Sequence, residues 1–254
     1  MNDELIERAA TQIQASKRPC VLTGAGVSKE SDIPTFRDAL DGLWAQYDPR
    51  QLATPTAFAR DPKLVWDFYE MRRERMRPAK PNPGHIALAR IERLKGRLPV
   101  ITQNVDDLHE LGGSTQVIHL HGLIAHNKCS RNCQGNPTLI DVSHIEWDRT
   151  SGPPPCPYCG AYVRPDVVWF GEMLPREPLE HAYNTASECD LMLVIGTSGI
   201  ITPAADMPLV AKRSGASLIE INPHASELTP VMDMWLGAPS GEVLPRILAA
   251  MERL

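Results

Sequence analysis

The chain has 254 residues, of which 43% are hydrophobic and 22% are charged, and its formal net charge is -5. These values are typical of a globular protein built as one large domain, or as one domain with a small insertion. The negative charge argues against a nucleic-acid-binding surface, and no apolar run approaches the ~20 residues that a membrane helix needs. The first residues are acidic and helical in pattern, unlike a targeting peptide. We therefore expect a cytoplasmic protein that binds neither membranes nor nucleic acid directly.

Helical and strand patterns alternate along most of the chain. Apolar residues at helical spacing predict helices over residues 3–16, 62–76, 83–94, 177–188, 203–213 and 244–254. Short apolar runs predict strands over residues 20–23, 98–102, 117–120, 167–170, 191–195 and 217–221. Strands that alternate with helices are typical of a doubly wound parallel sheet, so we predict an α/β fold of the Rossmann-like kind.

Two cysteine pairs stand in a segment rich in Cys, Pro and Gly. Cys129 and Cys133 form the first pair, Cys156 and Cys159 the second, and their spacing matches a tetrahedral zinc ribbon. Four thiolates would fill the coordination shell, so the predicted Zn²⁺ is structural. Unrelated free thiols are the alternative, and His126 could replace one thiolate.

Polar residues follow four of the predicted strands. Gly24-Ala25-Gly26 resembles the start of a dinucleotide-binding turn, although Lys29 stands where the third glycine belongs and a plain turn is the alternative. The other polar ends are Thr102-Gln103-Asn104, Gly196-Thr197-Ser198 and Asn222. Because ligands bind beyond the carboxyl ends of parallel strands, these ends predict a polar crevice of dinucleotide size.

The densest polar cluster surrounds the strands at 98–102 and 117–120. It contains Gln103, Asn104, Asp106 and His109, and the second strand leads to His121. Amide, carboxylate and imidazole groups together favour polar recognition combined with proton transfer. A capped turn with a satisfied histidine is the alternative.

One face of the helix predicted at 62–76 carries Val65, Tyr69, Arg72 and Met76. A phenol and a guanidinium on a mostly apolar face could bind a carboxylate, to which arginine donates two parallel hydrogen bonds. An arginine that extends over the core to reach solvent is the alternative.

Taken together, these motifs resemble the sirtuins, which are NAD-dependent protein lysine deacylases. The resemblance runs from about residue 15 to residue 250 and rests on GAGVS at 24–28, PTFR at 34–37, TQNVDDLH at 102–109, HLHG at 119–122, the four cysteines, VVWFGE at 167–172 and GTS at 196–198. It implies NAD as cofactor, a structural Zn²⁺, and acyl-lysine-bearing proteins or peptides as partners. The implied domains are a Rossmann-like NAD-binding domain (1–25, 98–125 and 166–254), a cofactor-binding loop with a helical module (26–97), and a small zinc-binding insertion (126–165).

The resemblance also implies a role for individual residues. His121, which precedes Gly122, would be the general base. Cofactor binding would fall to Gly24, Ala25, Gly26, Val27, Ser28, Thr35, Phe36, Arg37, Gln103, Asn104, Val105, Asp106, Gly196, Thr197, Ser198, Asn222 and Ser240. Val168, Phe170, Gly171 and Glu172 would bind the substrate peptide as an added strand.

Within the family, Phe68-Tyr69-x-x-Arg72 resembles the subgroup that prefers succinyl, malonyl and glutaryl groups, and Ala39 would leave the acyl pocket roomy. This resemblance favours the reading of Tyr69 and Arg72 as substrate residues of a desuccinylase or demalonylase that also accepts acetyl groups. In the implied reaction the acyl amide oxygen attacks C1′ of the nicotinamide ribose, and His121 then takes a proton from the ribose diol. Nicotinamide and O-acyl-ADP-ribose are the products. A protein mono-ADP-ribosyltransferase, a non-catalytic NAD or ADP-ribose sensor and a dehydrogenase are the alternatives, the last disfavoured by the broken glycine pattern.

Overall fold

The computed structural model describes residues 3–33 and 47–254, and the chain divides into two compact units. The first unit comprises Met1–Ile33, Lys80–Leu120 and Arg176–Leu254. The second comprises Pro34–Ala79 and His121–Pro175. Residues 26–33 and 80–97 thus belong to the first unit, and residues 121–125 and 166–175 to the second.

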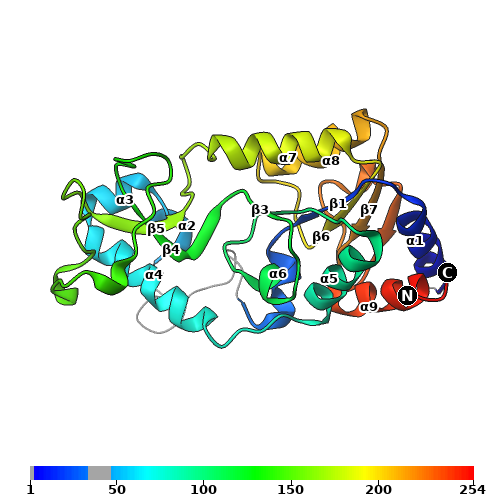
Figure 1. Cartoon of the computed structure of the whole chain (residues 1–254), viewed down its shortest axis with the longest axis horizontal. Helices are drawn as coiled ribbons and strands as arrows, with labels where there is room; N and C mark the ends of the chain where they lie inside the picture. Colours follow the sequence, from blue (N-terminus) through cyan, green and yellow to red (C-terminus); the bar gives the residue numbers. More distant parts are fainter. Residues whose placement is uncertain (1–2, 34–46) are drawn as a thin grey trace. The chain divides into compact units, whose positions relative to one another are not determined.

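The first unit is built on a parallel sheet (Figure 1). Among the described residues the sheet has six strands in the order β3-β2-β1-β6-β7-β8. Their bounds are β1 Pro19–Thr23, β2 Val100–Thr102, β3 Val117–His119, β6 Leu191–Ile195, β7 Ser217–Ile221 and β8 Met234–Leu236. Every neighbouring pair runs parallel, which confirms the predicted sheet.

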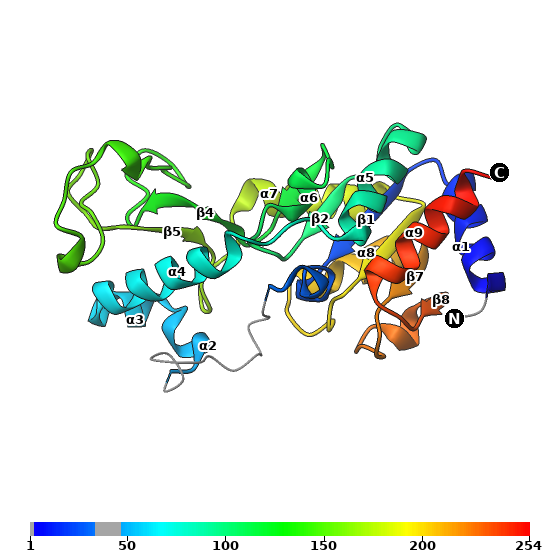
Figure 2. The same ribbon diagram turned by 90° about the horizontal axis from the view of Figure 1, so that it is seen from below.

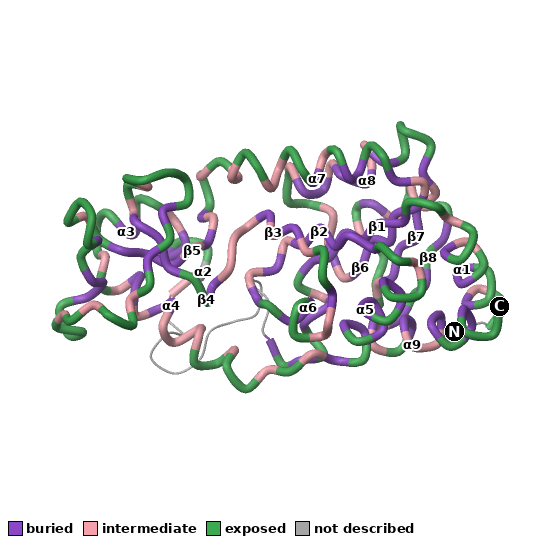
Figure 3. Tube along the Cα trace, in the orientation of Figure 1, coloured by how far each residue is buried: buried purple, intermediate pink, exposed green. Residues whose placement is uncertain are grey.

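Helices cover both faces of this sheet (Figures 1 and 2). The helices of this unit are α1 Asp3–Ala15, α5 Pro83–Lys95, α6 Leu108–Leu111, α7 Arg176–Glu188, α8 Met207–Arg213 and α9 Ser240–Met251. Helices α1, α5 and α9 pack together over one face, and α7 and α8 pack together on the other. Residues of β1 and β6 are therefore buried on both faces, which explains their unbroken apolar runs. Figure 3 shows these central strands as buried.

The second unit is smaller and more irregular. It contains α2 Pro49–Leu52, α3 Pro55–Arg60, α4 Pro62–Met76 and an antiparallel pair of strands, β4 Gly122–Cys129 and β5 Val163–Val167. The pairing of β4 with β5 shifts register between Leu123 and Asn127, and α4 packs against both strands. Among the described residues, no helix of either unit is both long and apolar enough to cross a membrane.

The strand predictions differ from the structure at β4, β5 and β8. The strand expected at 167–170 is wrong: the observed strand is β5, and residues 168–170 follow it without regular structure. β5 reads Val-Arg-Pro-Asp-Val, so it lacks a long apolar run and owes its conformation to pairing with β4. Strands β4 and β8 were not predicted. The eight residues of β4 do not alternate regularly between apolar and polar, and the three residues of β8 at the sheet edge carry too little periodicity to be recognised.

Candidate active site

The polar strand ends of the first unit lie at the carboxyl edge of its sheet. The order β3-β2-β1-β6-β7-β8 places β1 next to β6, and from these two strands the chain proceeds outward in opposite directions. Such a switch point is where open parallel α/β sheets bind their ligands.

The loops that follow β1 and β6 touch through their backbones. A Cβ atom on Gly26 would lie 2.7 Å from the Cα of Gly196, and one on Gly196 would lie 2.4 Å from the nitrogen of Val27. The amide of Gly26 donates to the backbone oxygen of Gly196 (2.8 Å), and the amide of Val27 donates to the backbone oxygen of Gly24 (3.1 Å). In a dinucleotide-binding turn such amides face a pyrophosphate. Instead the 3₁₀ turn Ala25–Val27 uses them within the protein, and glycine is required here because the two loops approach so closely.

Side chains join the strand ends in a continuous line of hydrogen bonds. Nε2 of Gln103 donates to Oγ1 of Thr197 (3.0 Å), and Nδ2 of Asn222 donates to the backbone oxygen of Thr197 (3.0 Å). Nδ2 of Asn104 donates to Oγ of Ser28 (2.9 Å). The ends of β2, β6 and β7 and the loop after β1 are therefore brought together, as the polar motifs predict.

A buried carboxylate lies beside this line. Asp106 is 6% exposed, and burial raises the pKa of its carboxyl group despite a hydrogen bond from the amide of Leu108 (3.2 Å). His119 lies 3.3 Å from the oxygen of Asn104 through Nδ1 and 2.7 Å from Oε1 of Glu110 through Nε2. The amides, hydroxyls and one carboxylate along this switch point can form hydrogen bonds with ribose hydroxyls and with the carboxamide of a nicotinamide ring. The residues therefore fit a dinucleotide such as NAD.

The remaining predicted cofactor residues differ from one another in burial. Val105 and Ser198 are half-buried at the same strand ends, and Ala25 is exposed. Ser240 is buried at the start of α9, where its hydroxyl donates to Oε1 of Glu30 (3.2 Å). Thr35, Phe36, Arg37 and the expected pocket residue Ala39 lie outside the described residues.

The four cysteines of the second unit converge. Their sulfur atoms all lie within 4.8 Å of one another, with Sγ of Cys129 3.5 Å from that of Cys159 and Sγ of Cys133 3.8 Å from that of Cys156. Four thiolates bound to zinc at 2.3 Å would be about 3.8 Å apart, so the set fits a closed tetrahedral site. His126 is exposed on β4 and is not part of this cluster, which leaves the four thiolates as the ligand set.

His121 immediately precedes β4 in the second unit and is half-buried. Its backbone oxygen accepts a hydrogen bond from the amide of Val168 (2.9 Å), so the predicted base is tied to the predicted peptide-binding segment. Gly122 has φ +76°, and a Cβ there would lie 2.1 Å from the oxygen of Asp166. The glycine after His121 is therefore required by the close pairing of β4 with β5.

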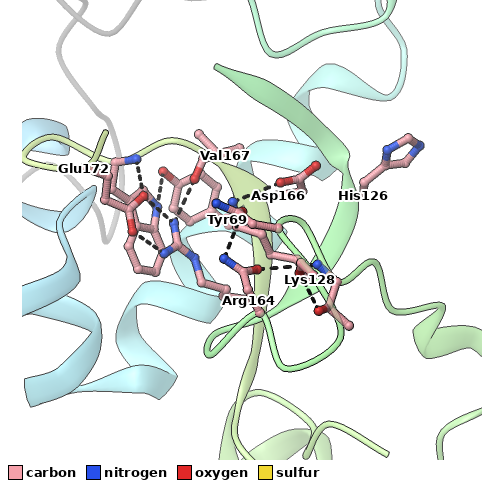
Figure 4. Close-up of polar contacts among 12 residues, drawn as sticks. Tyr69, His126, Lys128, Arg164, Asp166, Val167 and Glu172 are labelled. Atoms are coloured by element: carbon pink, nitrogen blue, oxygen red, sulfur yellow. Dashed lines mark hydrogen bonds and ion pairs between the residues drawn. The ribbon is translucent and has the colours of Figure 1, made fainter. Parts of the chain in front are cut away.

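The segment 168–172 is held by an ion pair between the buried Arg164 and the half-buried Glu172 (Figure 4). The guanidinium of Arg164 donates to both carboxylate oxygens of Glu172 (2.5 and 3.0 Å) and to the oxygen of Val167 (2.8 Å). The amide of Trp169 donates to the same carboxylate (2.8 Å), and that of Phe170 donates to the oxygen of Ala53 (2.9 Å). Burial raises the pKa of Glu172, but the hydrogen bond and positive charge of Arg164, the amide of Trp169 and the charge of Lys128 together hold this pKa below its ordinary value.

On α4 the predicted pair of side chains lies together. The guanidinium carbon of Arg72 is 5.7 Å from the centre of the Tyr69 ring and 5.8 Å from that of Phe68. Tyr69 is fully buried, and burial raises the pKa of its hydroxyl. Burial has the opposite effect on a cation and lowers the pKa of Arg72, which nevertheless stays protonated.

Three residues that hold these segments in place were not identified from the sequence. Arg164 and Trp169 complete the network around Glu172, and Arg73 donates to the oxygens of Ile124 (2.6 Å) and His126 (3.0 Å), where the register of β4 shifts. In the sequence, Arg73 is one of several arginines in a charged run and Trp169 one of several apolar residues. Only the fold reveals their partners.

Comparison with known proteins identifies the family of this chain. The sequence model of the Sir2 family matches residues 24–203. The NAD-dependent protein deacylase of Pyrococcus abyssi is 47% identical over 98% of this chain and 99% of its own length. NAD-dependent protein deacylase 1 of Pseudomonas aeruginosa is 49% identical over 95% and 97%.

Solved structures give the same result. The crystal structure of a Sir2 homolog–NAD complex superposes with a TM-score of 0.88 at 44% identity, covering 97% of this chain and 94% of that one. A Sir2 bound to acetylated peptide superposes with a TM-score of 0.84 at 30% identity, covering 96% and 97%. With a family match over most of its length and close relatives along nearly all of it, this chain belongs to the Sir2 family.

Proposed function

We propose that this protein is an NAD-dependent deacylase that removes acyl groups from lysine side chains of proteins, with succinyl, malonyl and glutaryl groups among its substrates as well as acetyl. The enzyme class follows from its membership of the Sir2 family and from relatives named NAD-dependent protein deacylases. The acyl preference rests on one observation: Tyr69 and Arg72 lie together on α4.

The first unit supplies the residues that hold the cofactor. Asn104, Asp106 and Ser28 meet at the ends of β1 and β2, and Thr197 and Asn222 meet at the ends of β6 and β7. The amide and hydroxyl groups of Asn104, Ser28, Thr197 and Asn222 would bind the carboxamide and ribose hydroxyls of NAD, with the carboxyl group of Asp106 beside them. NAD, when bound, supplies both the sugar that accepts the acyl group and nicotinamide as leaving group.

The second unit supplies the proton acceptor and the peptide-binding segment. His121 would take a proton at its imidazole, a step that a positioned histidine accelerates typically 10²–10⁴-fold. The half-buried Val168 and exposed Phe170 and Gly171 would line up beside an extended substrate peptide. The cysteine cluster holds this unit together and takes no part in the reaction, because four thiolates leave no open position on zinc.

The acyl group would be recognised on α4. A guanidinium binds a carboxylate through two parallel hydrogen bonds, and the rings of Phe68 and Tyr69 restrict the positions that the Arg72 guanidinium can take. Acetyl-lysine has no carboxylate, so the pair would distinguish acidic acyl groups from neutral ones.

The experiment compares peptides of one sequence that carry acetyl-, succinyl- or malonyl-lysine. The protein is incubated with NAD and each peptide, and the products are weighed by mass spectrometry. Loss of mass from lysine indicates deacylation, whereas a gain would indicate ADP-ribosyl transfer. We expect Arg72→Met to lower kcat/KM for the succinyl peptide by roughly 10- to 100-fold relative to that for the acetyl peptide, since a hydrogen bond to a charged group contributes about 1.5–3 kcal/mol.

Two controls accompany this comparison. Arg77→Met changes an exposed arginine at the end of the same helix and should leave the succinyl-to-acetyl ratio unchanged. His121→Tyr should abolish turnover of all three peptides. Equal losses on both peptides in Arg72→Met would make Arg72 a structural residue and remove the acidic-acyl proposal.

A further inference from the structure

Trp169 makes a direct contact with the proposed acyl-binding residue Tyr69. Its indole nitrogen Nε1 donates a hydrogen bond to the Tyr69 hydroxyl at 2.9 Å. Both side chains are buried, with Trp169 2% exposed and Tyr69 not exposed. The contact joins β5 and its following segment to α4, within the second unit.

This contact fixes the direction in which the Tyr69 hydroxyl can donate. An indole N–H is a donor only, so Trp169 cannot accept the hydrogen of the phenol. The phenol oxygen therefore accepts on the side facing Trp169, and its hydrogen must point away from the indole. A group that approaches that far side as an acceptor, such as a carboxylate, meets a donor that is already oriented.

Trp169 is itself held in place by the ion pair of Arg164 and Glu172. The guanidinium carbon of Arg164 lies 3.2 Å from the centre of the indole ring, while its nitrogens donate to Glu172 and to the oxygen of Val167 (Figure 4). Glu172 also accepts from the amide of Trp169. Backbone and ring of Trp169 are thus both fixed, which restricts the indole N–H to one direction. A cation over the face of an indole also attracts its π electrons, which favours donation by the N–H.

We propose that Trp169 is a positioning residue for the recognition of acyl groups that end in a carboxylate, acting through the orientation of the Tyr69 hydroxyl. Glu172 then serves as a positioning residue that holds Arg164 and Trp169, rather than as a residue that contacts the peptide. This inference rests on the proposed function, since it assigns to Trp169 a part in the same acyl selection.

The test uses Trp169→Phe in the full-length protein. Phenylalanine keeps an aromatic ring beside Arg164 but removes the N–H donor. We expect the ratio of kcat/KM for the succinyl peptide to that for the acetyl peptide to fall by about 10-fold, the lower end of the effect of losing one hydrogen bond to a charged group. The change should appear mainly in KM for the succinyl peptide, since the lost interaction binds the acyl group.

Two further variants distinguish orientation from folding. Tyr69→Phe should lower the ratio at least as much, and the double variant Trp169→Phe/Tyr69→Phe should be no worse than Tyr69→Phe alone, because Trp169 then has no hydroxyl to orient. Trp147→Phe removes a comparable indole hydrogen bond, from Nε1 to the oxygen of Gly152 (3.0 Å), and should leave the ratio unchanged. Thermal unfolding and bound zinc are measured for each variant.

The outcomes separate this inference from the proposal on which it rests. The assignment of Trp169 is overturned if the succinyl-to-acetyl ratio depends on Arg72 but not on Trp169. It is also overturned if the losses from Trp169→Phe and Tyr69→Phe add. In both cases the proposed acyl preference stands. If the ratio depends on neither residue, the acyl preference itself fails.

Discussion

The two units of this protein are stabilised by different means. The first unit buries one continuous apolar cluster drawn from α1, α5, α9 and the strands of its sheet, with side chains such as Ile13, Leu193 and Leu244 fully buried. The core of the second unit contains Trp66, Ile140 and Val163 together with two of the four clustered cysteines. The unit also contains ion pairs of a buried cation with a half-buried carboxylate, among them Lys128–Asp166 (3.0 Å) and Arg164–Glu172. We therefore expect hydrophobic burial to provide most of the stability of the first unit, and the second to depend more on its metal site and on paired charges.

The largest expected effect is the loss of the metal from the second unit. A structural zinc site contributes roughly 10–16 kcal/mol in small zinc-binding peptides, more than a small apolar core can replace. Cys156→Ser, or treatment with a strong chelator, should unfold residues 121–175 while the first unit keeps its structure. Limited proteolysis followed by mass spectrometry measures this directly: cleavage should be confined to the second unit.

A matched control is Cys189→Ser, which changes a buried cysteine of the first unit outside the cluster. This variant should retain its zinc and its protease resistance. If the second unit stays folded after zinc is removed, or if both units unfold together, the contrast between the units is mistaken.

The second expected effect concerns two buried histidines of the first unit. Burial lowers the pKa of His85 to about 4, and burial likewise lowers the pKa of His109 well below its usual value. The two rings lie 4.9 Å apart, and Nε2 of His109 lies 3.0 Å from the hydroxyl of Thr23. Both imidazoles are therefore neutral in the folded protein.

Neutral buried histidines make the first unit sensitive to acid. An unfolded histidine has a pKa of about 6.5, so between pH 6.5 and 4 the unfolded chain binds more protons than the folded one. The stabilisation is complete above pH 6.5 and is lost as the pH falls toward 4. His85 alone should cost about 3 kcal/mol of unfolding free energy over this range.

Urea unfolding at pH 7, 6 and 5 measures this loss, with the zinc-bound protein used throughout. His85→Gln should flatten the pH dependence, and His144→Gln, which changes an exposed histidine of the second unit, should not. A first unit equally stable at pH 7 and pH 5 would contradict the assignment of neutral, buried imidazoles.

The same contrast explains what the sequence could predict. In the first unit, strands such as β6 are uniformly apolar and the polar motifs stand at their ends, so the parallel sheet and the grouping of Gln103, Asn104 and Asn222 follow from local patterns. The zinc ligands Cys129 and Cys156 follow from spacing. The second unit was predicted less well, because its order depends on contacts between residues far apart in sequence, such as Trp169 with Tyr69, which no local pattern encodes.

The smallest expected effect is at a polar contact of the first unit. Pro239 precedes α9 and offers no side-chain cap, and the carboxylate of Glu30 takes its place by accepting from the amide of Gly241 (2.9 Å) and the hydroxyl of Ser240 (3.2 Å). A negative charge at a helix N-terminus is stabilising, and loss of a capping acceptor costs about 1 kcal/mol. Glu30→Ala should therefore lower the unfolding free energy of the first unit by about 1 kcal/mol, and Glu30→Gln, which keeps an acceptor oxygen but loses the charge, by about half of that. Both are measured by urea unfolding at pH 7.

Because the apolar cluster beneath α9 is extensive, the loss of unfolding free energy should stay at this level. A loss of several kcal/mol would mean that polar contacts stabilise the first unit as much as the second.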